Sequence, residues 1–224
     1  MTKSSFMKSI QQREKEFQLN RMVEEIDKKF KLNNSVKQAM LSVDRELFVP
    51  QMFKHFAYTL DALPMGSEQW ISSPLTVAKM TQFLEADGCD RVLEIGCGSG
   101  YQAAVLSKLF NRVFTIERID SLLQEAKARF RELEIKNILT KFEDGNKGWD
   151  SFAPFDRIIF SASPSKIPAI LFDQLKDGGI LLAPIEQDGG LQIITRFYKN
   201  NGTITEETIE SCNFVPVLKG TVYK

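Results

Sequence analysis

Apolar side chains recur at helical spacing through residues 5–43, so we expect this stretch to be helical. A first helix is followed by a second one, for which Asn34 or Ser35 is a suitable N-cap and which runs through residues 40 and 41. The predicted apolar face of the first helix is formed by Phe17, Met22, Ile26 and Phe30.

The helical period is lost between residues 45 and 66, where proline and aromatic residues are frequent. Because the apolar side chains of this segment need burial, we expect an extended, ordered loop rather than a flexible linker. Helical spacing resumes at Ser73-Pro74, a pair typical of a helix start, with serine as the N-cap and proline in the first helical position. The helix behind it has a predicted buried stripe of Val77, Met80, Phe83 and Leu84.

From residue 91 onward, short apolar runs alternate with helical stretches. This alternation predicts a parallel, doubly wound sheet that binds ligands at the carboxyl ends of its strands. Two glycines, Gly178 and Gly179, are expected to end the last helix. Strands are predicted at 91–95, 112–117, 137–142, 155–162 and 179–185, and helices at 99–110, 120–133 and 167–175.

The end of the chain has a different pattern. Residues 191–199 and 203–210 have strand character and flank Asn201-Gly202, a turn signal typical of a β-hairpin. Residues 212–220 form a further short extended piece. The predicted fold class is therefore α/β, with N-terminal helices, a doubly wound and mostly parallel sheet, and an antiparallel C-terminal hairpin.

Length and charge narrow the class of protein. The chain has 224 residues, which fits a single domain. Its 29 basic and 29 acidic residues balance, so no overall field attracts nucleic acid or an anionic membrane, and we expect neither as a partner. No apolar run reaches the roughly 18 residues of a membrane span. The N-terminal residues lack the apolar core of a secretory signal, so a cytoplasmic location is expected.

Cysteine and histidine usage limits the chemistry. The three cysteines, Cys89, Cys97 and Cys212, form no C-x-x-C pair, which argues against a disulfide framework and a structural zinc site. His55 is the single histidine, so a centre with several histidine ligands is excluded and no metal is expected. Nothing pairs His55 with an aspartate or a serine, and we interpret it as a packing or surface residue.

A glycine-rich turn follows the first predicted strand of the sheet in the stretch VLEIGCGSGY. Its glycines are Gly96, Gly98 and Gly100, whereas the dinucleotide pattern G-x-G-x-x-G requires a third glycine at position 101, which is Tyr101. The second strand ends at Glu117, where an acid can accept both ribose hydroxyls of an adenosine. A glycine cluster alone is compatible with a bare turn, and Glu117 alone with a surface acid. Their joint spacing indicates a nucleoside site instead.

The pattern E-x-G-x-G-x-G followed by a ribose-binding acid resembles the S-adenosylmethionine-dependent methyltransferases. This resemblance implies S-adenosyl-L-methionine as cofactor, S-adenosyl-L-homocysteine as product, and the seven-stranded Rossmann-like fold of that superfamily. It also suggests that Asp144 binds the adenine amino group, although Asp144-Gly145 alone fits a simple turn. We expect Cys97 to fill the loop rather than react. The implied cofactor-binding residues are Glu94, Gly96, Cys97, Gly98, Ser99, Gly100, Glu117, Arg118, Asp144, Gly145 and Ser161.

The fourth strand ends in the stretch Ser161-Ala162-Ser163-Pro164. Enzymes of this fold that methylate amino groups of nucleic acids carry N/D-P-P-Y/F at that position. Its absence, together with the balanced charge, argues against an adenine or cytosine acceptor.

A more specific resemblance covers nearly the whole chain from about residue 40. The stretches that carry it, in order, are RELFVP (45–50), AYTLDALPMG (57–66), QWISSP (69–74), VLEIGCGSGYQAAVLSKL (92–109), TIER (115–118), EDGNKGW (143–149), APFDRIIFSAS (153–163), IPAILFDQLKDGGILLAPI (167–185) and FVPVLKG (214–220). Together they resemble the protein-L-isoaspartate O-methyltransferases, which repair isomerised aspartate and deamidated asparagine. The resemblance implies methyl transfer to the α-carboxyl of isoaspartyl residues in damaged peptides and proteins, with repair through a succinimide.

In that family an I-S-x-P element precedes the glycine turn, and here it is residues 71–74. The resemblance places Ser72 beside the methyl group and the acceptor carboxylate as the catalytic residue; without it, Ser72 is simply a second polar residue next to a helix cap. The chain departs from the family pattern at Trp70, where threonine is usual, and at Leu75, where histidine is usual. Trp70 is expected to narrow the acceptor pocket or to stack on the substrate backbone. The expected substrate-binding residues are Gln69, Trp70, Ile71 and Pro216.

The chain is thus expected to be a single, monomeric methyltransferase domain over residues 1–224. Residues 1–75 would provide the N-terminal helices and the substrate-side loop, and residues 76–224 the cofactor-binding core and the C-terminal strands. Two alternatives stay open at this point. One is a methyltransferase of the same fold that acts on a small molecule or on another carboxyl acceptor, and the other is a binding protein that holds the nucleoside without turnover.

Overall fold

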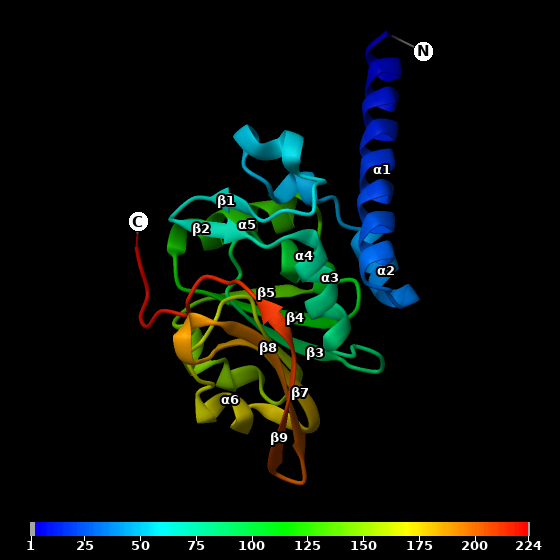
Figure 1. The fold of residues 1–224 in the computed structure, drawn as a ribbon. Helices are drawn as coiled ribbons and strands as arrows, with labels where there is room; N and C mark the ends of the chain where they lie inside the picture. Colours follow the sequence, from blue (N-terminus) through cyan, green and yellow to red (C-terminus); the bar gives the residue numbers. More distant parts are fainter. Residues whose placement is uncertain (1–2, 224) are drawn as a thin grey trace.

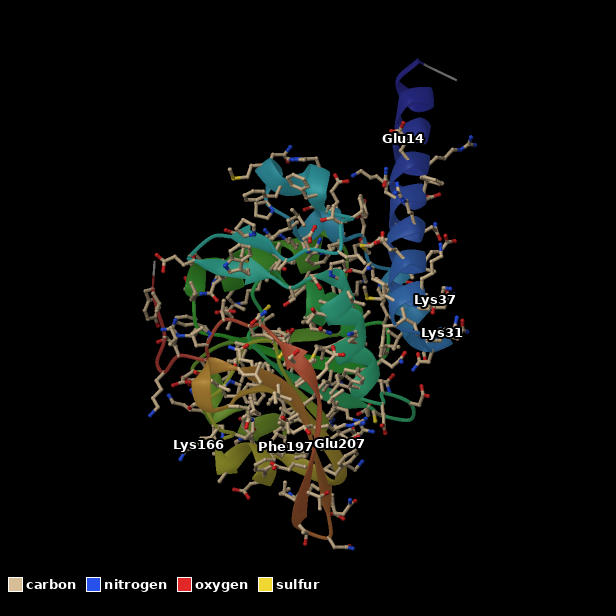
Figure 2. All side chains as sticks on the ribbon, viewed as in Figure 1. Glu14, Lys31, Lys37, Lys166, Phe197 and Glu207 are labelled. Atoms are coloured by element: carbon tan, nitrogen blue, oxygen red, sulfur yellow. The ribbon has the colours of Figure 1, made fainter. Side chains whose placement is uncertain are left out.

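The computed structural model describes residues 3–223 of the chain (Figure 1). Helix α1 (Lys3–Lys29) is long, and its N-terminal half stands away from the body of the protein. Figure 2 shows Glu14 on this projecting part, whereas Lys31 and Lys37 lie at its base. There both lysines donate to Oδ2 of Asp27, at 2.8 and 3.2 Å, which ties the end of α1 to the start of α2 (Asn34–Leu41).

Two details of this helical region differ from the prediction. The N-cap of α2 is Asn33, whose side chain accepts a hydrogen bond of 2.8 Å from the Val36 amide. Phe17 is 67% exposed and does not belong to the buried face of α1. Two residues of an α-helix span about 200°, so Phe17 points away from the side on which Leu19 is buried. The buried face consists of Leu19, Met22, Val23 and Ile26.

The segment after α2 is ordered, as predicted, but it is not simply extended. It contains two 3₁₀ helices, Arg45–Phe48 and Gln51–Phe56, and a small antiparallel sheet of β1 (Leu63–Met65) and β2 (Gln69–Ile71). Strands of three residues are too short to produce a recognisable alternation of apolar and polar positions. Ser73 then caps α3 (Pro74–Phe83) by accepting a hydrogen bond of 3.0 Å from the Thr76 amide, as the Ser-Pro pair predicts.

A seven-stranded sheet forms the centre of the protein, in the order β5-β4-β3-β6-β7-β8-β9. The strands from β5 to β7 are parallel, whereas β8 and β9 are antiparallel to their neighbours, so the predicted fold class is confirmed. The elements are β3 (Arg91–Ile95), α4 (Tyr101–Leu106), β4 (Arg112–Glu117), α5 (Asp120–Glu132), β5 (Ile138–Phe142), β6 (Phe155–Phe160), α6 (Ala169–Asp173), β7 (Leu175–Glu186), β8 (Gln192–Asn200) and β9 (Thr203–Cys212), with short 3₁₀ turns at Gly145–Lys147, Asp150–Phe152 and Asp188–Gly190.

The last predicted helix is shorter than its sequence pattern suggests. Helix α6 ends at Asp173, and the two glycines expected to terminate it lie within β7 instead. Strand β7 is irregular there, because Leu175 pairs with Phe155 whereas Ile180 pairs with Arg157. Gly178 has a φ of 76°, which accommodates the extra residues as a bulge.

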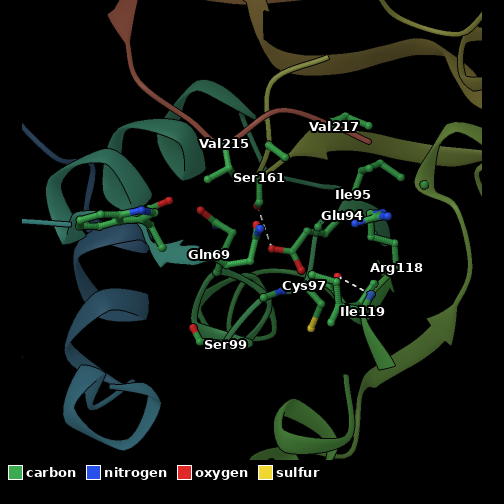
Figure 3. Close-up of a pocket in the computed structure, with 18 of the residues that line it drawn as sticks. Gln69, Glu94, Ile95, Cys97, Ser99, Arg118, Ile119, Ser161, Val215 and Val217 are labelled. Atoms are coloured by element: carbon green, nitrogen blue, oxygen red, sulfur yellow. Dashed lines mark hydrogen bonds between the residues drawn. The ribbon is translucent and has the colours of Figure 1, made fainter. Parts of the chain in front are cut away.

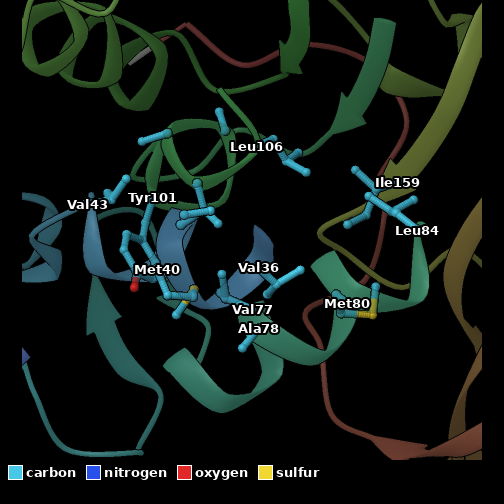
Figure 4. Close-up of a cluster of buried hydrophobic side chains, with 14 of the residues drawn as sticks. Val36, Met40, Val43, Val77, Ala78, Met80, Leu84, Tyr101, Leu106 and Ile159 are labelled. Carbon is cyan, nitrogen blue, oxygen red and sulfur yellow. The ribbon is translucent and has the colours of Figure 1, made fainter. Parts of the chain in front are cut away.

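Apolar side chains fill both faces of the sheet. On one face, the helices α1 to α4 contribute to one core cluster that includes Met22, Val36, Val77 and Leu106, and part of it is shown in Figure 4. On the other face, α6 and the segment around Phe152 cover a second cluster. Neighbouring residues of β3 divide between the two clusters, as expected for a strand that is buried on both sides.

The strand order produces a crevice between β3 and β6, at the carboxyl ends of the parallel strands. From β3 the chain proceeds outward through β4 and β5, then returns to place β6 on the opposite side of β3. The connections that leave the carboxyl ends of β3 and β6 therefore diverge. Such a switch point is where doubly wound folds bind their ligands.

Candidate active site

A cavity of about 870 Å³, including its open mouth, lies at the carboxyl ends of β3, β4 and β6 (Figure 3). The segments that line it come from strand β2, the glycine turn, the end of β4, the end of β6 and the C-terminal tail. Its lining residues are Gln69, Trp70, Ile71, Ser72, Val77, Glu94, Ile95, Gly96, Cys97, Gly98, Ser99, Tyr101, Gln102, Ile116, Glu117, Arg118, Ile119, Gly145, Ser161, Ala162, Val215, Pro216, Val217 and Leu218.

The glycine turn between β3 and α4 forms the floor of this cavity. Gly96, Gly98 and Gly100 all have positive φ, at 96°, 51° and 88°, a conformation that glycine adopts without strain. Gly100 itself does not line the cavity. A Cβ atom there would lie 2.7 Å from the ring of Phe130, so this glycine allows α5 to pack closely against the turn.

Glu117 is buried at the end of β4 and lines the cavity. One carboxylate oxygen, Oε2, accepts a hydrogen bond of 2.8 Å from the Gly98 amide, and the other, Oε1, accepts one of 2.9 Å from the Ile119 amide. Because each carboxylate oxygen has two lone pairs, both keep an acceptor site after these bonds are formed. The carboxylate is thus fixed in place and still able to receive two hydroxyl groups.

Glu94 lies beneath the glycine turn and is completely buried. The hydroxyls of Thr115 and Ser161 donate to its two carboxyl oxygens at 2.6 and 3.0 Å, and Figure 3 shows the Ser161 contact. Burial raises the pKa of Glu94 to about 8, although the two hydrogen bonds act in the opposite direction. At neutral pH the group is therefore largely protonated, and a cation in the cavity would favour its ionised form.

Three further predicted residues, Cys97 and Ser99 in the turn and Arg118 after β4, have mostly structural contacts. Cys97 is buried, and burial raises the pKa of its thiol well above the usual range, so the thiol is unreactive. The Ser99 hydroxyl accepts a hydrogen bond of 3.3 Å from the Tyr101 amide at the start of α4. Arg118 lines the cavity, but its Nε donates to the Gly220 carbonyl at 3.0 Å.

Asp144 does not line the cavity, whereas its neighbour Gly145 does. Both of its carboxylate oxygens are used by the chain itself. Oδ1 accepts hydrogen bonds from the Asn146 amide and side chain at 2.9 and 2.8 Å, and Oδ2 accepts one of 2.8 Å from the Gly220 amide. The side chain therefore forms the turn that its sequence pattern suggests, and it also holds the C-terminal tail.

The C-terminal tail, residues 213–223, contributes more of the cavity wall than the sequence predicted. Val215, Val217 and Leu218 line the cavity together with Pro216, the one tail residue predicted. The tail is held near β6 by Ser163, whose amide donates to the Val215 carbonyl at 2.7 Å and whose carbonyl accepts from the Val217 amide at 2.8 Å. These contacts are made by main-chain groups, so they leave no signal in the side-chain pattern.

Residues 69–72, which the sequence assigns to the substrate side and which we call the acceptor-side element, form the opposite wall. Ile71 is buried, Ser72 is half-buried and Trp70 is 55% exposed, while the Gln69 side chain folds back to the carbonyls of Ser67 and Glu68 at 3.3 and 3.4 Å. Trp70 and Ser72 also line a second, more open cavity of about 1140 Å³ next to the first. Its other lining residues are Ala62, Ser73, Thr76, Ser161, Cys212, Asn213, Phe214 and Val215.

The predicted site residues therefore converge, with two exceptions. Every predicted residue except Gly100 and Asp144 lines the first cavity, and Trp70, Ser72 and Ser161 lie in the wall shared by both cavities. Sequence reasoning missed Thr115, which donates to Glu94, and Arg45, which donates to the Ser72 carbonyl at 3.1 Å. His55 lies away from these residues, in a groove between α1 and the second 3₁₀ helix.

Two kinds of feature are absent from residues 3–223. No group of three or more histidine, cysteine, aspartate or glutamate side chains in this range is arranged to hold a metal ion. No helix in the same range is long and apolar enough to cross a membrane.

Comparison with known proteins gives matches along almost the whole chain. The family described as Protein-L-isoaspartate(D-aspartate) O-methyltransferase matches residues 17–222. A protein-L-isoaspartate O-methyltransferase from Helicobacter pylori (strain G27) is 58% identical over 200 residues, covering 89% of this chain and 95% of that protein. One from Maricaulis maris (strain MCS10) is 47% identical over 185 residues, covering 83% and 86%.

Solved structures agree with these matches. A structure described as a protein-L-isoaspartate O-methyltransferase superposes with a TM-score of 0.83 at 26% identity, covering 89% of this chain and 65% of the other. A second one, from Plasmodium falciparum and in complex with S-adenosyl-L-homocysteine, has a TM-score of 0.81 at 24% identity, covering 90% and 99%. The family match includes the acceptor-side element, the glycine turn and the tail.

Proposed function

The chain belongs to the protein-L-isoaspartate O-methyltransferase family, and from this membership we propose which of its residues carry out the reaction. The enzyme is an S-adenosylmethionine-dependent protein carboxyl O-methyltransferase. It methylates the α-carboxyl of L-isoaspartyl residues in damaged peptides and proteins, and the ester then closes to a succinimide, which begins repair. The assignment of residues to cofactor and substrate is our proposal.

We propose that the cavity above the glycine turn holds S-adenosylmethionine. When bound, this cofactor supplies a methyl group attached to a sulfonium centre and leaves as S-adenosylhomocysteine. The fit rests on two observations: the left-handed backbone of the glycine turn, and a fixed carboxylate, Glu117, with two free acceptor positions. Glu117 would receive the ribose hydroxyls, as its place at the end of the second parallel strand suggests.

The other cavity residues follow from the same assignment. Glu94, with Ser161 and Thr115 on its carboxyl group, would face the cationic part of the cofactor, because it is the buried acid beneath the turn. Gly145 would lie against the adenine, because it is the residue of this turn that lines the cavity. A Cβ atom there would overlap the Ile95 side chain, so the close packing at this position requires glycine. Asp144 would act indirectly, by holding the tail that covers this part of the site.

The observation that carries the proposed mechanism is the position of Ser72 in the wall shared by the two cavities. An isoaspartyl carboxyl has a pKa near 4, so it is already an anion at neutral pH and needs no general base. It needs orientation instead. We propose that the Ser72 hydroxyl donates a hydrogen bond to this carboxylate and aligns it with the methyl group, which converts a two-body encounter into a one-body step.

The substrate peptide would lie in the second cavity as an added strand. Trp70 pairs with Pro64 in the β1–β2 ladder, and proline has no N–H to donate. That pair is therefore a non-hydrogen-bonded one, and the main-chain N–H and C=O of Trp70 point towards the free edge of β2. An extended peptide would bind these groups, with the indole of Trp70 against its backbone. Pro216 would contact it where the second cavity meets the first, because Pro216 lines the first cavity. Gln69 and Ile71 would hold the strand in place.

We also propose that residues 1–224 form one domain, in which residues 1–75 provide the substrate side and residues 76–224 the cofactor core. The hydrophobic cluster shared by both parts supports this proposal. A monomeric state, the absence of nucleic-acid partners and a cytoplasmic location stay predictions. Light scattering of the purified protein tests the first of these.

The decisive experiment is a radiolabelled methyl transfer assay. The purified protein is offered a synthetic isoaspartyl peptide, the same peptide with normal aspartate, and no peptide. Label should appear in base-labile ester with the isoaspartyl peptide and stay at background in both controls. Equal labelling of the aspartyl peptide, or labelling of a small molecule alone, would favour a different carboxyl acceptor.

A further inference from the structure

Arg45 is the largest side chain that is completely buried in the protein, with an exposed fraction of 0%. It begins the first 3₁₀ helix and points behind the acceptor-side element. Its Nη1 donates to the Ala57 carbonyl at 2.7 Å, and its Nη2 donates to the carbonyls of Asp61 and Ser72 at 3.0 and 3.1 Å. One guanidinium thus joins three segments of the main chain.

This buried cation is only partly compensated. Among the side chains that the structure describes, no carboxylate lies within ion-pair distance of Arg45, and its Nε is buried without a hydrogen-bond partner. The nearest aromatic ring, that of Tyr101, is centred 5.9 Å from the guanidinium carbon, and its hydroxyl is also unpartnered. A buried arginine without a paired anion is costly to the stability of the fold.

Its contact with Ser72 is the one that reaches the active site. The Ser72 carbonyl belongs to the same residue that lines both cavities. Fixing that carbonyl fixes the backbone from which the hydroxyl extends, and the other two carbonyls connect it to the β1 side of the acceptor region. A hydroxyl that must direct a carboxylate to within a few tenths of an ångström needs such support.

We propose that Arg45 is a positioning residue for the methyl-acceptor reaction, which acts by clamping the main chain of Ser72. The inference rests on the proposed role of Ser72. A purely structural arginine would stabilise the fold without affecting what the Ser72 hydroxyl does, so the two roles are separable.

Arg157 provides a matched control. Its guanidinium also donates to three main-chain carbonyls, those of Leu84, Glu85 and Asp156, at 2.5, 2.8 and 2.8 Å. It lies near the amino end of β6, whereas the active site is at the carboxyl end. Arg157→Lys therefore reproduces the loss of an arginine clamp at a site remote from the chemistry.

The test is a double-mutant cycle of Arg45→Lys and Ser72→Ala, with kcat and KM for a synthetic isoaspartyl peptide measured at saturating S-adenosylmethionine. We expect Arg45→Lys to lower kcat/KM about 10- to 100-fold when Ser72 is present, and less than about threefold when it is replaced by alanine. The dissociation constant of S-adenosylhomocysteine, measured by calorimetry, should change less than about threefold, because Arg45 does not line the cofactor cavity. Arg157→Lys should lower only the melting temperature.

Additive effects in the cycle, or an equal loss of kcat/KM in Arg157→Lys, would overturn the proposal. If Arg45→Lys does not fold, NMR of the wild-type protein decides the question. Titration with the isoaspartyl peptide should then shift the Arg45 guanidinium and Ser73 amide resonances, and unchanged resonances would contradict the clamp. Failure of the proposed function looks different, since the wild type would not methylate the peptide, or Ser72→Ala alone would leave kcat/KM unchanged.

Discussion

Glu117 holds the glycine turn in place, because its Oε2 accepts a hydrogen bond of 2.8 Å from the amide of Gly98. Its other oxygen fixes the start of the segment after β4, through the Ile119 amide at 2.9 Å. The same carboxylate therefore shapes the cavity and lines it. A substitution at this position should affect the empty protein as well as the binding of the cofactor.

We expect Glu117→Ala to raise the dissociation constant of S-adenosylhomocysteine by about 10- to 100-fold, since two ribose hydroxyls lose a charged acceptor. It should also lower the melting temperature without ligand, because two amides, of which that of Ile119 is buried, lose their partner. Calorimetry and thermal unfolding measure the two effects. Glu117→Gln keeps the size of the side chain and one acceptor oxygen, so it should be less severe. Unchanged affinity in Glu117→Ala would remove this residue from the ribose site.

Ser72 and Ser73 are adjacent serines with different expected roles. Ser72→Ala should lower kcat for an isoaspartyl peptide by about 10- to 1000-fold, as expected when one positioning donor is removed. Ser73 caps α3 through the Thr76 amide, so Ser73→Ala should cost about 1 kcal/mol of stability and change kcat little. Steady-state kinetics and denaturant unfolding of both variants check this assignment. Wild-type kinetics in Ser72→Ala would contradict it.

The buried carboxyl of Glu94 should make stability fall with rising pH. Its pKa is about 8 in the folded protein against 4.5 as the ordinary value, so between these values the folded state holds a proton that the unfolded state has released. Stability from this group is therefore greatest at or below pH 4.5 and is lost as pH rises through about 8. Urea unfolding at several pH values between 5 and 8 should show a decline that is absent in Glu94→Gln. Parallel curves for the two proteins would be inconsistent with a raised pKa.

Binding of the cofactor should act on the same proton. A positively charged ligand favours the ionised form of Glu94, so S-adenosylmethionine should release a proton on binding near pH 7. Calorimetry in two buffers of different ionisation enthalpy measures that release, and Glu94→Gln should reduce it.

The turn between β1 and β2 contains two non-glycine residues in the left-handed region, Ser67 and Glu68, with φ of 60° and 59°. A non-glycine residue in this conformation destabilises the folded state by roughly 1 kcal/mol, and glycine removes that strain. Glycine also increases the conformational entropy of the unfolded chain, which opposes the gain. The net effect of Glu68→Gly should therefore lie between zero and a stabilisation of about 1 kcal/mol. Glu134→Gly, at a φ of 52° after α5, is a control remote from the acceptor side. Denaturant unfolding measures both, and a clear loss of stability in Glu68→Gly would show that the glutamate side chain contributes contacts of its own.

Asp144→Ala should loosen the C-terminal tail. Loss of the 2.8 Å bond to the Gly220 amide should increase hydrogen–deuterium exchange over residues 217–222 and raise the dissociation constant of S-adenosylhomocysteine several-fold, by about 1 kcal/mol. Glu143→Ala is the matched control, because Glu143 accepts from Lys147 and from the Asp144 amide in the same turn but has no bond to the tail. Equal exchange in the two variants would count against the tail contact.

The regular helices and strands could be predicted because their apolar and polar residues alternate with the period of the element. Helix α3 begins at Ser73-Pro74, and the strands β3 and β4 end at the glycine turn and at Glu117, as their patterns indicate. Phe17 was assigned to the wrong face of α1, since apolar residues spaced by five positions drift around a helix. The β1–β2 ladder was missed, because strands of three residues have no detectable alternation.

The residues of the candidate site also differ in whether the sequence indicates them or only the structure reveals them. Glu94, Gly98 and Ser72, for which we propose roles in binding, could be named from the sequence because they lie in motifs that resemble those of known methyltransferases. The tail contributes Val215, Val217 and Leu218, whose role depends on main-chain bonds to Ser163 that any residue could form. Arg45 acts through carbonyl groups far along the chain, so its importance appears only when the three partners are brought together.

The tail crosses above the cavity between Ser163 and Asp120, whose amide donates to the Val222 carbonyl at 3.0 Å. A ligand that enters the cavity therefore contacts a wall whose two ends are anchored by main-chain groups, at Ser163 and at Asp120. The path of this wall can stay the same while the side chains on it change. Ligand specificity on this side should then vary through Val215, Val217 and Leu218 without disturbing the sheet.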